Sequence, residues 1–158
     1  MHAGSARVRH GGFALVVVLA GLAIVSLGLA FLGPSWAHQA QRERERELMR
    51  VGVLYAHALA SYRAASPGAQ KHLPQRLEEL LNDVRFAGTT RHLRRLYFDP
   101  LDPHRPLAEV RDASGGIVGV RSTSDATPLA RGPVVLDDRT LPPAQRYSDW
   151  IFSALTPP

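Results

Sequence analysis

The feature that most constrains this chain is an uncharged apolar run near its N-terminus. No charged side chain occurs between His10 and His38, and Phe13–Leu32 is almost purely apolar. As a helix rising ~1.5 Å per residue, these 20 residues span ~30 Å, the thickness of the hydrocarbon core of a bilayer. Arg7, Arg9 and a glycine pair precede the run. This order of segments is compatible with a membrane anchor, a secretory signal, or a leader that is cut at the polar/apolar boundary.

Two further features bear on what the apolar run is. The hydrophobic part of a secretory signal has about 7 to 15 residues, so this run is long for a signal. The tripeptide Ser35-Trp36-Ala37 nevertheless resembles a signal-peptidase site, so a secreted domain cut after Ala37 remains an alternative. Two arginines precede the run and four follow it by Arg50. By the positive-inside rule, which places the more basic flank of a membrane span in the cytoplasm, these counts alone favour a cytoplasmic C-terminal side. The rule weakens, however, for a long translocated domain.

Composition excludes some kinds of site. The chain has no cysteine, which removes disulfides, thiol catalysis and cysteine-based zinc sites. The formal net charge is +5, and a basic chain can bind nucleic acid or an anionic membrane surface. The arginines are spread along the chain and mixed with glutamates, so we expect no nucleic-acid partner.

A helical pattern resumes beyond the apolar run. Gly33 and Pro34 would kink or interrupt a helix. Six later positions follow the spacing of one apolar helix face: Leu48, Val51, Tyr55, Ala58, Leu59 and Tyr62. The sequence therefore predicts one long helix from about Phe13 to Tyr62, with a first half suited to a membrane and an amphipathic second half.

A run of alternating charges, RERERE, separates the two halves of this helix. It carries no apolar side chain on any face, which is typical of a solvated segment. Charges three positions apart are neighbours on a helix, so three ion pairs are expected: Arg42–Glu45, Glu43–Arg46 and Arg44–Glu47. In an assembly of parallel helices, the same charges could instead pair between subunits.

The rest of the chain changes from helix signals to strand signals. Ser66-Pro67-Gly68 ends the long helix, and short helices are predicted at Pro74–Leu81 and, after Thr90, at Arg91–Tyr97. The strand candidates begin with a hairpin around DASGG: Leu107–Arg111, Ile117–Ser122, Thr127–Leu129, Val134–Leu136 and Tyr147–Phe152. The predicted fold class is α+β, with the long N-terminal helix packed on a small antiparallel sheet.

The amphipathic half of the helix needs a cover, because its leucines and tyrosines would otherwise lie in water. One sheet face can provide it: Ile117, Val120, Trp150 and Phe152.

No motif in the sequence predicts an enzyme. A nucleophile elbow, a P-loop, HExxH and a dinucleotide fingerprint are all absent from the sequence, and the histidines are scattered without a serine partner. Asp99-x-x-Asp102-x-His104 has metal-ligand residue types, but its prolines favour an extended turn, so we expect no metal. Arg91, His92, Arg94 and Arg95 form a basic cluster that we interpret as a solvated helix face. We expect no cofactor.

Several blocks of the sequence resemble the type IV pilin-like family, and are most similar to the pseudopilins of bacterial type II secretion. A basic leader ends at Gly12-Phe13, and Pro34 lies 21 residues after that phenylalanine. Further blocks occur in an order similar to one pseudopilin subgroup: ERELMRVGVLYAHALASYRAASPG, LPQRLEELLNDVRF, TRHLRRLYFDPLDP, GIVGVRSTSDATPL and YSDWIF. The resemblance covers most of the chain.

The resemblance implies how the N-terminus is processed. In the family, a prepilin peptidase cuts between the glycine and the phenylalanine and methylates the new amine, which places the cut at Gly12 and Phe13. The family usually has glutamate four residues after the cut-site phenylalanine, where this chain has Val17. A carboxylate there is tolerated in the bilayer because it pairs with a neighbouring subunit's amine. Val17 cannot pair in this way, which favours a minor, tip or initiating subunit. The family's calcium loop has no match here.

The resemblance also implies a domain organisation and a set of partners. The expected segments are a leader at 1–12, a transmembrane half-helix at 13–33, an amphipathic half-helix at 34–62 and a periplasmic α+β domain at 63–158. The expected partners are other pseudopilins, the prepilin peptidase, the inner-membrane secretion platform and the lipid bilayer. The expected location is the bacterial inner membrane, with a single pass. An unprocessed, anchored periplasmic binding or accessory protein is the main alternative.

Overall fold

The computed structural model of the chain describes residues 11–136 and 139–154, apart from the side chains of residues 11 and 27–35. The chain forms two compact units, Met1–Ala40 and Gln41–Pro158. Helix α1, Gly11–Ala64, provides the helical residues of the first unit and the first 24 residues of the second. The backbone is therefore helical throughout the range that the apolar and amphipathic patterns predict.

The first unit consists, in its described part, of α1 residues only. The side chains at 12–26 are all exposed. Within the part of the chain that the structure describes, no helix contains an apolar stretch of sufficient length to cross a membrane. The predicted span Phe13–Leu32 includes residues 27–32, whose side chains lie outside the described set, as does that of Pro34.

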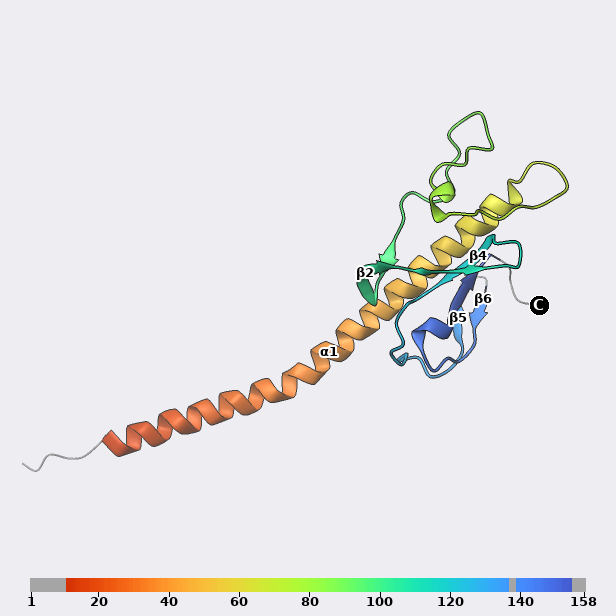
Figure 1. The fold of residues 1–158 in the computed structure, drawn as a ribbon. Coiled ribbons are helices and arrows are strands. Elements are labelled where there is room, and N and C mark those ends of the chain that lie inside the picture. The colour runs from red at the N-terminus through yellow and green to blue at the C-terminus, as the bar shows by residue number, and fades with distance from the viewer. Residues whose placement is uncertain (1–10, 137–138, 155–158) are drawn as a thin grey trace, which may run out of the picture. The chain divides into compact units, whose positions relative to one another are not determined.

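The second unit contains small antiparallel sheets packed beside the second half of α1 (Figure 1). The largest sheet has the strand order β3-β4-β7, and two further strand pairs are β1–β2 and β5–β6. The strands are β1 (Phe98–Asp99), β2 (Asp102–Pro106), β3 (Ala108–Arg111), β4 (Ile117–Arg121), β5 (Val134–Leu136), β6 (Arg139–Leu141) and β7 (Ile151–Ser153). Two short 3-10 helices complete it: η1 (Leu77–Leu80) and η2 (Tyr147–Asp149). The predicted α+β class is confirmed.

The predicted hairpin around DASGG is also confirmed. Strands β3 and β4 pair antiparallel, with Val110 opposite Gly119. Asp112 stabilises the turn, because its carboxylate accepts hydrogen bonds from the backbone N–H groups of Ser114 and Gly116. Gly115 has a φ of +85°, a conformation that glycine adopts without strain.

The hydrophobic core lies between α1 and the sheet, as the apolar spacing predicts. All six predicted helix positions are at most 4% exposed: Leu48, Val51, Tyr55, Ala58, Leu59 and Tyr62. The four predicted sheet residues are fully buried: Ile117, Val120, Trp150 and Phe152. Gly52 faces β7, where an added Cβ would come within 2.3 Å of the Phe152 ring.

Two predicted elements are wrong, and hydrogen bonding explains both. Arg91–Tyr97 is not helical. The backbone N–H groups of His92 and Leu93 both donate to the Leu80 carbonyl, which holds this segment beside η1 in a non-helical path. Thr127–Leu129 is not a strand, and the Leu129 N–H donates to a glutamate side chain of α1.

Two further predicted elements are shorter or different in type. The helix predicted at Pro74–Leu81 is reduced to the single 3-10 turn η1. The strand predicted at Tyr147–Phe152 begins as the 3-10 turn η2, and only its end belongs to β7. Strand β2 has the sequence DPHRP, whose prolines and charged residues do not predict a strand, and β1 and β6, with two and three residues, are too short to give a strand pattern.

Candidate functional site

The residues expected at the cleavage site lie together at the start of α1. Gly12 and Phe13 are adjacent helical residues, and Phe13 is 77% exposed. Val17 lies four positions further on, on the same face of the helix, and is 53% exposed. A Cβ added at Gly12 would meet no atom within 4 Å, so nothing in the described chain requires glycine there sterically.

Residues 12–26 of the first unit present an apolar surface around the whole helix. Its large exposed hydrophobic residues occupy every direction around the helix axis: Phe13, Leu15, Val16, Val17, Val18, Leu19, Leu22, Ile24 and Val25. Small residues, including Ala14, Ala20, Gly21 and Ala23, lie between them. A helix that is apolar all round needs lipid or other protein chains around it.

The ion pairs of the charged run RERERE differ from those that the sequence predicts. Glu43 and Arg46 do pair, at 3.5 Å between Oε2 and Nη1, but both are largely exposed, so the pair contributes little. Glu47 pairs with Arg50 instead of Arg44, with Nη2 2.6 Å from Oε1. Glu45 turns towards the β-rich part of its unit instead of pairing with Arg42.

Glu45 attaches the loop before β5 to α1. Its carboxylate accepts hydrogen bonds from the backbone N–H groups of Leu129 at 2.8 Å and Ala130 at 3.2 Å. The Tyr147 hydroxyl donates a third at 2.7 Å. Burial and the neighbouring Glu45 carboxylate raise the pKa of Tyr147 to about 12. One residue of the charged run therefore has a structural role in the second unit.

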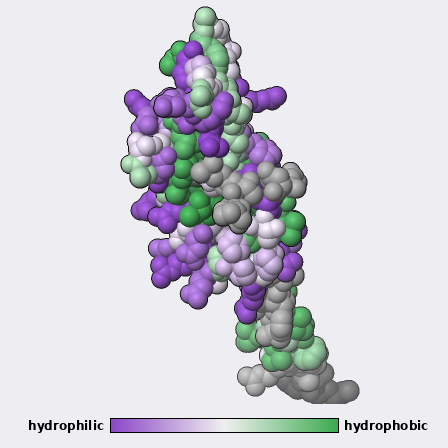
Figure 2. Space-filling model, turned by 90° about the vertical axis from the view of Figure 1, so that its right-hand side faces the viewer, coloured by the Kyte–Doolittle hydropathy of each residue, from purple (hydrophilic) through white to green (hydrophobic). Residues whose placement is uncertain are grey.

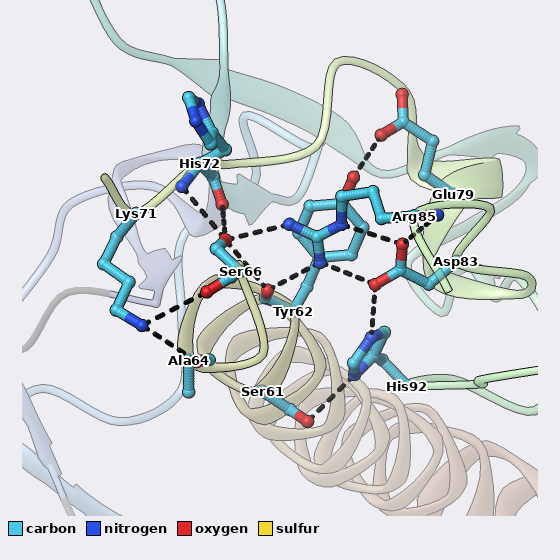
Figure 3. Close-up of polar contacts among 10 residues, drawn as sticks. All are labelled: Ser61, Tyr62, Ala64, Ser66, Lys71, His72, Glu79, Asp83, Arg85 and His92. Carbon is cyan, nitrogen blue, oxygen red and sulfur yellow. Dashed lines mark hydrogen bonds and ion pairs between the residues drawn. The ribbon is translucent and has the colours of Figure 1, made fainter. Parts of the chain in front are cut away.

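A buried polar cluster surrounds Asp83 near the C-terminal end of α1 (Figure 3). The Asp83 side chain is fully buried and accepts hydrogen bonds from Arg85 Nε at 2.8 Å and Nη2 at 2.5 Å. His92 Nε2 lies 3.2 Å from the same carboxylate. The Arg85 guanidinium holds the pKa of Asp83 far below its usual range. The Asp83 cluster is therefore a buried ion pair with an imidazole partner.

Arg85 also closes the end of α1. Its guanidinium donates to the Tyr62 carbonyl at 2.9 Å and to Ser66 Oγ at 2.8 Å, and lies 3.6 Å from the centroid of the Tyr62 ring. Carbonyls in the last turn of a helix have no partner within the helix. Arg85 supplies one, so the Asp83 cluster fixes the segment around Asp83 to the helix terminus.

His92 does have a serine partner, contrary to the sequence-based expectation. Ser61 Oγ lies 2.9 Å from His92 Nδ1. Because the Asp83 carboxylate only accepts, His92 Nε2 carries a proton and donates it to Asp83. Ser61, His92 and Asp83 thus have the order of groups found in acyl-transfer triads.

The surroundings of Ser61 do not support acyl transfer. Ser61 lies inside α1, where backbone N–H groups donate along the helix and cannot stabilise an oxyanion. The Asp83 carboxylate is also bound by Arg85, with which it forms a buried ion pair. The Ser61–His92 bond therefore joins the non-helical segment around His92 to α1.

The remaining sequence candidates are also brought into structural contacts. Asp99 is buried, and its carboxylate accepts hydrogen bonds from Ser122 Oγ and from the Thr123 N–H, each at 2.7 Å. Among the described residues, no group of three or more acidic or histidine side chains could hold a metal ion. The Asp102 carboxylate forms an ion pair with Arg105 and does not share a site with the Asp99 and His104 side chains.

A shallow groove lies along α1 beside β5. It has a volume of about 630 Å³ and is lined mainly by apolar side chains: Met49, Arg50, Val53, Leu54, His57, Val135 and Leu136. Val135 is 78% exposed. Figure 2 shows one face of the molecule, on which hydrophilic side chains surround a smaller hydrophobic area.

Comparison with known proteins gives no relative. The chain matches no protein-family model, no curated protein and no solved structure.

Proposed function

We propose that this protein is a pseudopilin subunit of a type II secretion machine or a related type IV pilus-like machine. The observation that carries the proposal is the exposed apolar surface of residues 12–26 at the start of a helix whose later residues form one side of a hydrophobic core. A helix of this kind needs an apolar environment for its first part and an attached folded domain for its second. Pilin-like subunits combine these two parts, and the resemblance of the cleavage region and the later sequence blocks supports the same assignment.

The proposed mechanism is assembly without catalysis. The helix is inserted in the inner membrane, the prepilin peptidase removes residues 1–12, and the apolar helices of several subunits pack side by side. Helices in lipid associate through small residues that allow close approach, and Ala14, Ala20, Gly21 and Ala23 are exposed on this helix. The pilin-like domain at 63–158 then lies on the periplasmic side, where it contacts other pseudopilins and the secretion platform.

The proposed subunit position is minor, at the tip or at initiation. Val17 replaces the carboxylate that a shaft subunit uses to neutralise a neighbour's N-terminal amine. A carboxylate costs up to ~2.5–3.5 kcal/mol on the insertion scale, the value at the bilayer centre, and Val17 removes both the cost of a carboxylate inside the bilayer and the pairing. A subunit with no neighbour ahead of it has no amine to neutralise.

The test is the intact mass of the protein extracted from membranes of a bacterium that has a prepilin peptidase. The expected species begins at Phe13 and carries one added methyl group. Gly12→Val should abolish this species without disturbing the helix, because an added side-chain atom at Gly12 meets nothing within 4 Å. Gly21→Ala is a matched control: its added methyl group also meets nothing within 4 Å, and processing should be unchanged.

Three results would refute the proposal, each in favour of a different protein. An intact N-terminus in the wild-type chain indicates an unprocessed anchored protein. A chain that begins at His38 indicates a secreted domain. A Gly12→Val variant that still gives the wild-type mature mass indicates that processing does not depend on this glycine.

A further inference from the structure

The two tryptophans of the chain lie in opposite environments. Trp150 is fully buried in the core of the second unit, and its indole N–H donates to the Pro142 carbonyl. Trp36, in the first unit, is 76% exposed. Within the described residues, the Trp36 indole makes no hydrogen bond or ring contact. A large aromatic side chain in this condition is a candidate for contact with another phase or another molecule.

The position of Trp36 in the sequence indicates which contact this is. It follows the apolar run Phe13–Leu32 by four residues, and the polar residues His38 and Gln39 come after it, separated from it by Ala37. At ~1.5 Å per residue, Trp36 lies ~6 Å beyond the end of the run and ~35 Å along the helix from Phe13. The hydrocarbon core of a bilayer is ~30 Å thick, so these two aromatic residues would lie at its opposite boundaries.

The immediate surroundings of Trp36 are chemically mixed. A shallow hollow of about 320 Å³ is lined by Trp36, Gln39 and Ala40, which lie on one face of the helix. An amide and a methyl group beside an exposed indole match the head-group region of a bilayer, which is apolar on one side and hydrated on the other. Tryptophan is enriched at this level because its ring is apolar and its N–H still reaches water or a lipid oxygen.

We propose that Trp36 is a lipid-interface anchor, whose indole lies between the acyl chains and the head groups of the bilayer and fixes the depth of the helix. The occupant of this surface is phospholipid. The proposal rests on the membrane insertion contained in the proposed function. It adds a defined boundary, at Trp36, between the segment in lipid and the segment in water, and it thereby holds Phe13 near the opposite boundary.

The test measures the fluorescence of Trp36 in the full-length chain reconstituted in vesicles of phosphatidylethanolamine and phosphatidylglycerol. Trp36→Phe retains only Trp150, so subtraction of its spectrum from that of the wild-type chain gives the Trp36 signal without a change to the core. Bromine atoms quench tryptophan on contact, and they are placed in separate samples on the acyl chains either near the head group or near the chain end. We expect the head-group-proximal bromines to quench the Trp36 signal about twofold more strongly than the deep ones.

Internal controls make each outcome decisive. The Trp36→Phe protein should show no quenching by either lipid, because Trp150 is buried in the second unit. An unquenched Trp36 signal would overturn the proposal, because the indole would then lie in water. Stronger quenching by the deep bromines would also overturn it. So would a signal that changes when the protein is diluted with lipid, because the indole would then contact a second copy.

The failure of this inference can be distinguished from that of the proposed function. The mass of the same reconstituted protein, prepared from cells with a prepilin peptidase, reports processing at Gly12. Shallow quenching in a chain with an intact N-terminus supports the lipid-interface anchor and refutes the pseudopilin proposal. A correctly processed chain with an unquenched Trp36 supports the pseudopilin proposal and refutes the lipid-interface anchor.

Discussion

Gly52 is the position at which a single methyl group tests how α1 packs on the sheet. A Cβ at this position would lie 2.3 to 2.5 Å from three atoms of the Phe152 ring. The ring is fully buried and belongs to β7, so it cannot move into solvent to make room. Gly52→Ala therefore sets two effects against each other: a gain in helix propensity and an overlap in the core.

We expect the cost of the overlap to exceed the gain in helix propensity. Replacing glycine with alanine inside a helix stabilises it by about 1 kcal/mol, whereas overpacking a well-filled core costs about 1–3 kcal/mol. An approach of 2.3 Å is far inside van der Waals contact, so the cost belongs at the upper end of that range. We expect Gly52→Ala to lower the free energy of unfolding of the second unit by about 1–2 kcal/mol.

The assay is urea unfolding of a fragment that begins at Gln41, followed by the emission of Trp150, its only tryptophan. Phe152→Ala removes all three ring atoms that the added methyl group meets, so Gly52→Ala should be neutral or stabilising in that background. Gly88→Ala is the control, because its added methyl group meets nothing within 4 Å, and it should change stability by less than about 0.5 kcal/mol. If Gly52→Ala equals or exceeds the wild-type stability while Phe152 is retained, the packing argument is wrong.

The remaining predictions concern the second unit, the Asp83 cluster and Val17. The fragment from Gln41 should be soluble and monomeric with mixed helix and strand circular dichroism, because the core lies wholly within it; aggregation of every such fragment would contradict this. Asp83→Asn should lower its stability at neutral pH by about 3–5 kcal/mol, because Arg85 loses its buried partner. The native pKa of Asp83 is depressed, so its contribution to the free energy of unfolding is present above about pH 4 and disappears as the pH falls further. Urea unfolding between pH 7 and 3 should therefore show a loss of stability in the wild-type fragment. The loss should be smaller in Asp83→Asn. Val17→Glu should give no more sheared or cross-linked multimer than the wild-type chain at equal expression, and a clear gain would refute the minor-subunit position.

The sequence by itself determined the long helix, its packed face and the α+β class. The spacing from Leu48 to Tyr62 is a local property of a 3.6-residue period, so a one-dimensional pattern specifies which side is buried. The DASGG hairpin was equally accessible, because aspartate and glycine determine turn geometry over a few residues. The apolar character of Phe13–Leu32 is also readable from composition alone.

Only the tertiary structure decided the roles of individual charged residues. Nothing in the run RERERE distinguishes Glu45 from Glu43, but only Glu45 meets the backbone of residues 129 and 130, which lie 84 and 85 positions away. His92 was placed with three arginines as a solvated face, and its side chain is instead buried against Asp83. The segment around it forms no helix, because the Leu80 carbonyl accepts its N–H groups. Partners of this kind are set by chain folding over long separations, and short-range periodicity carries no information about them.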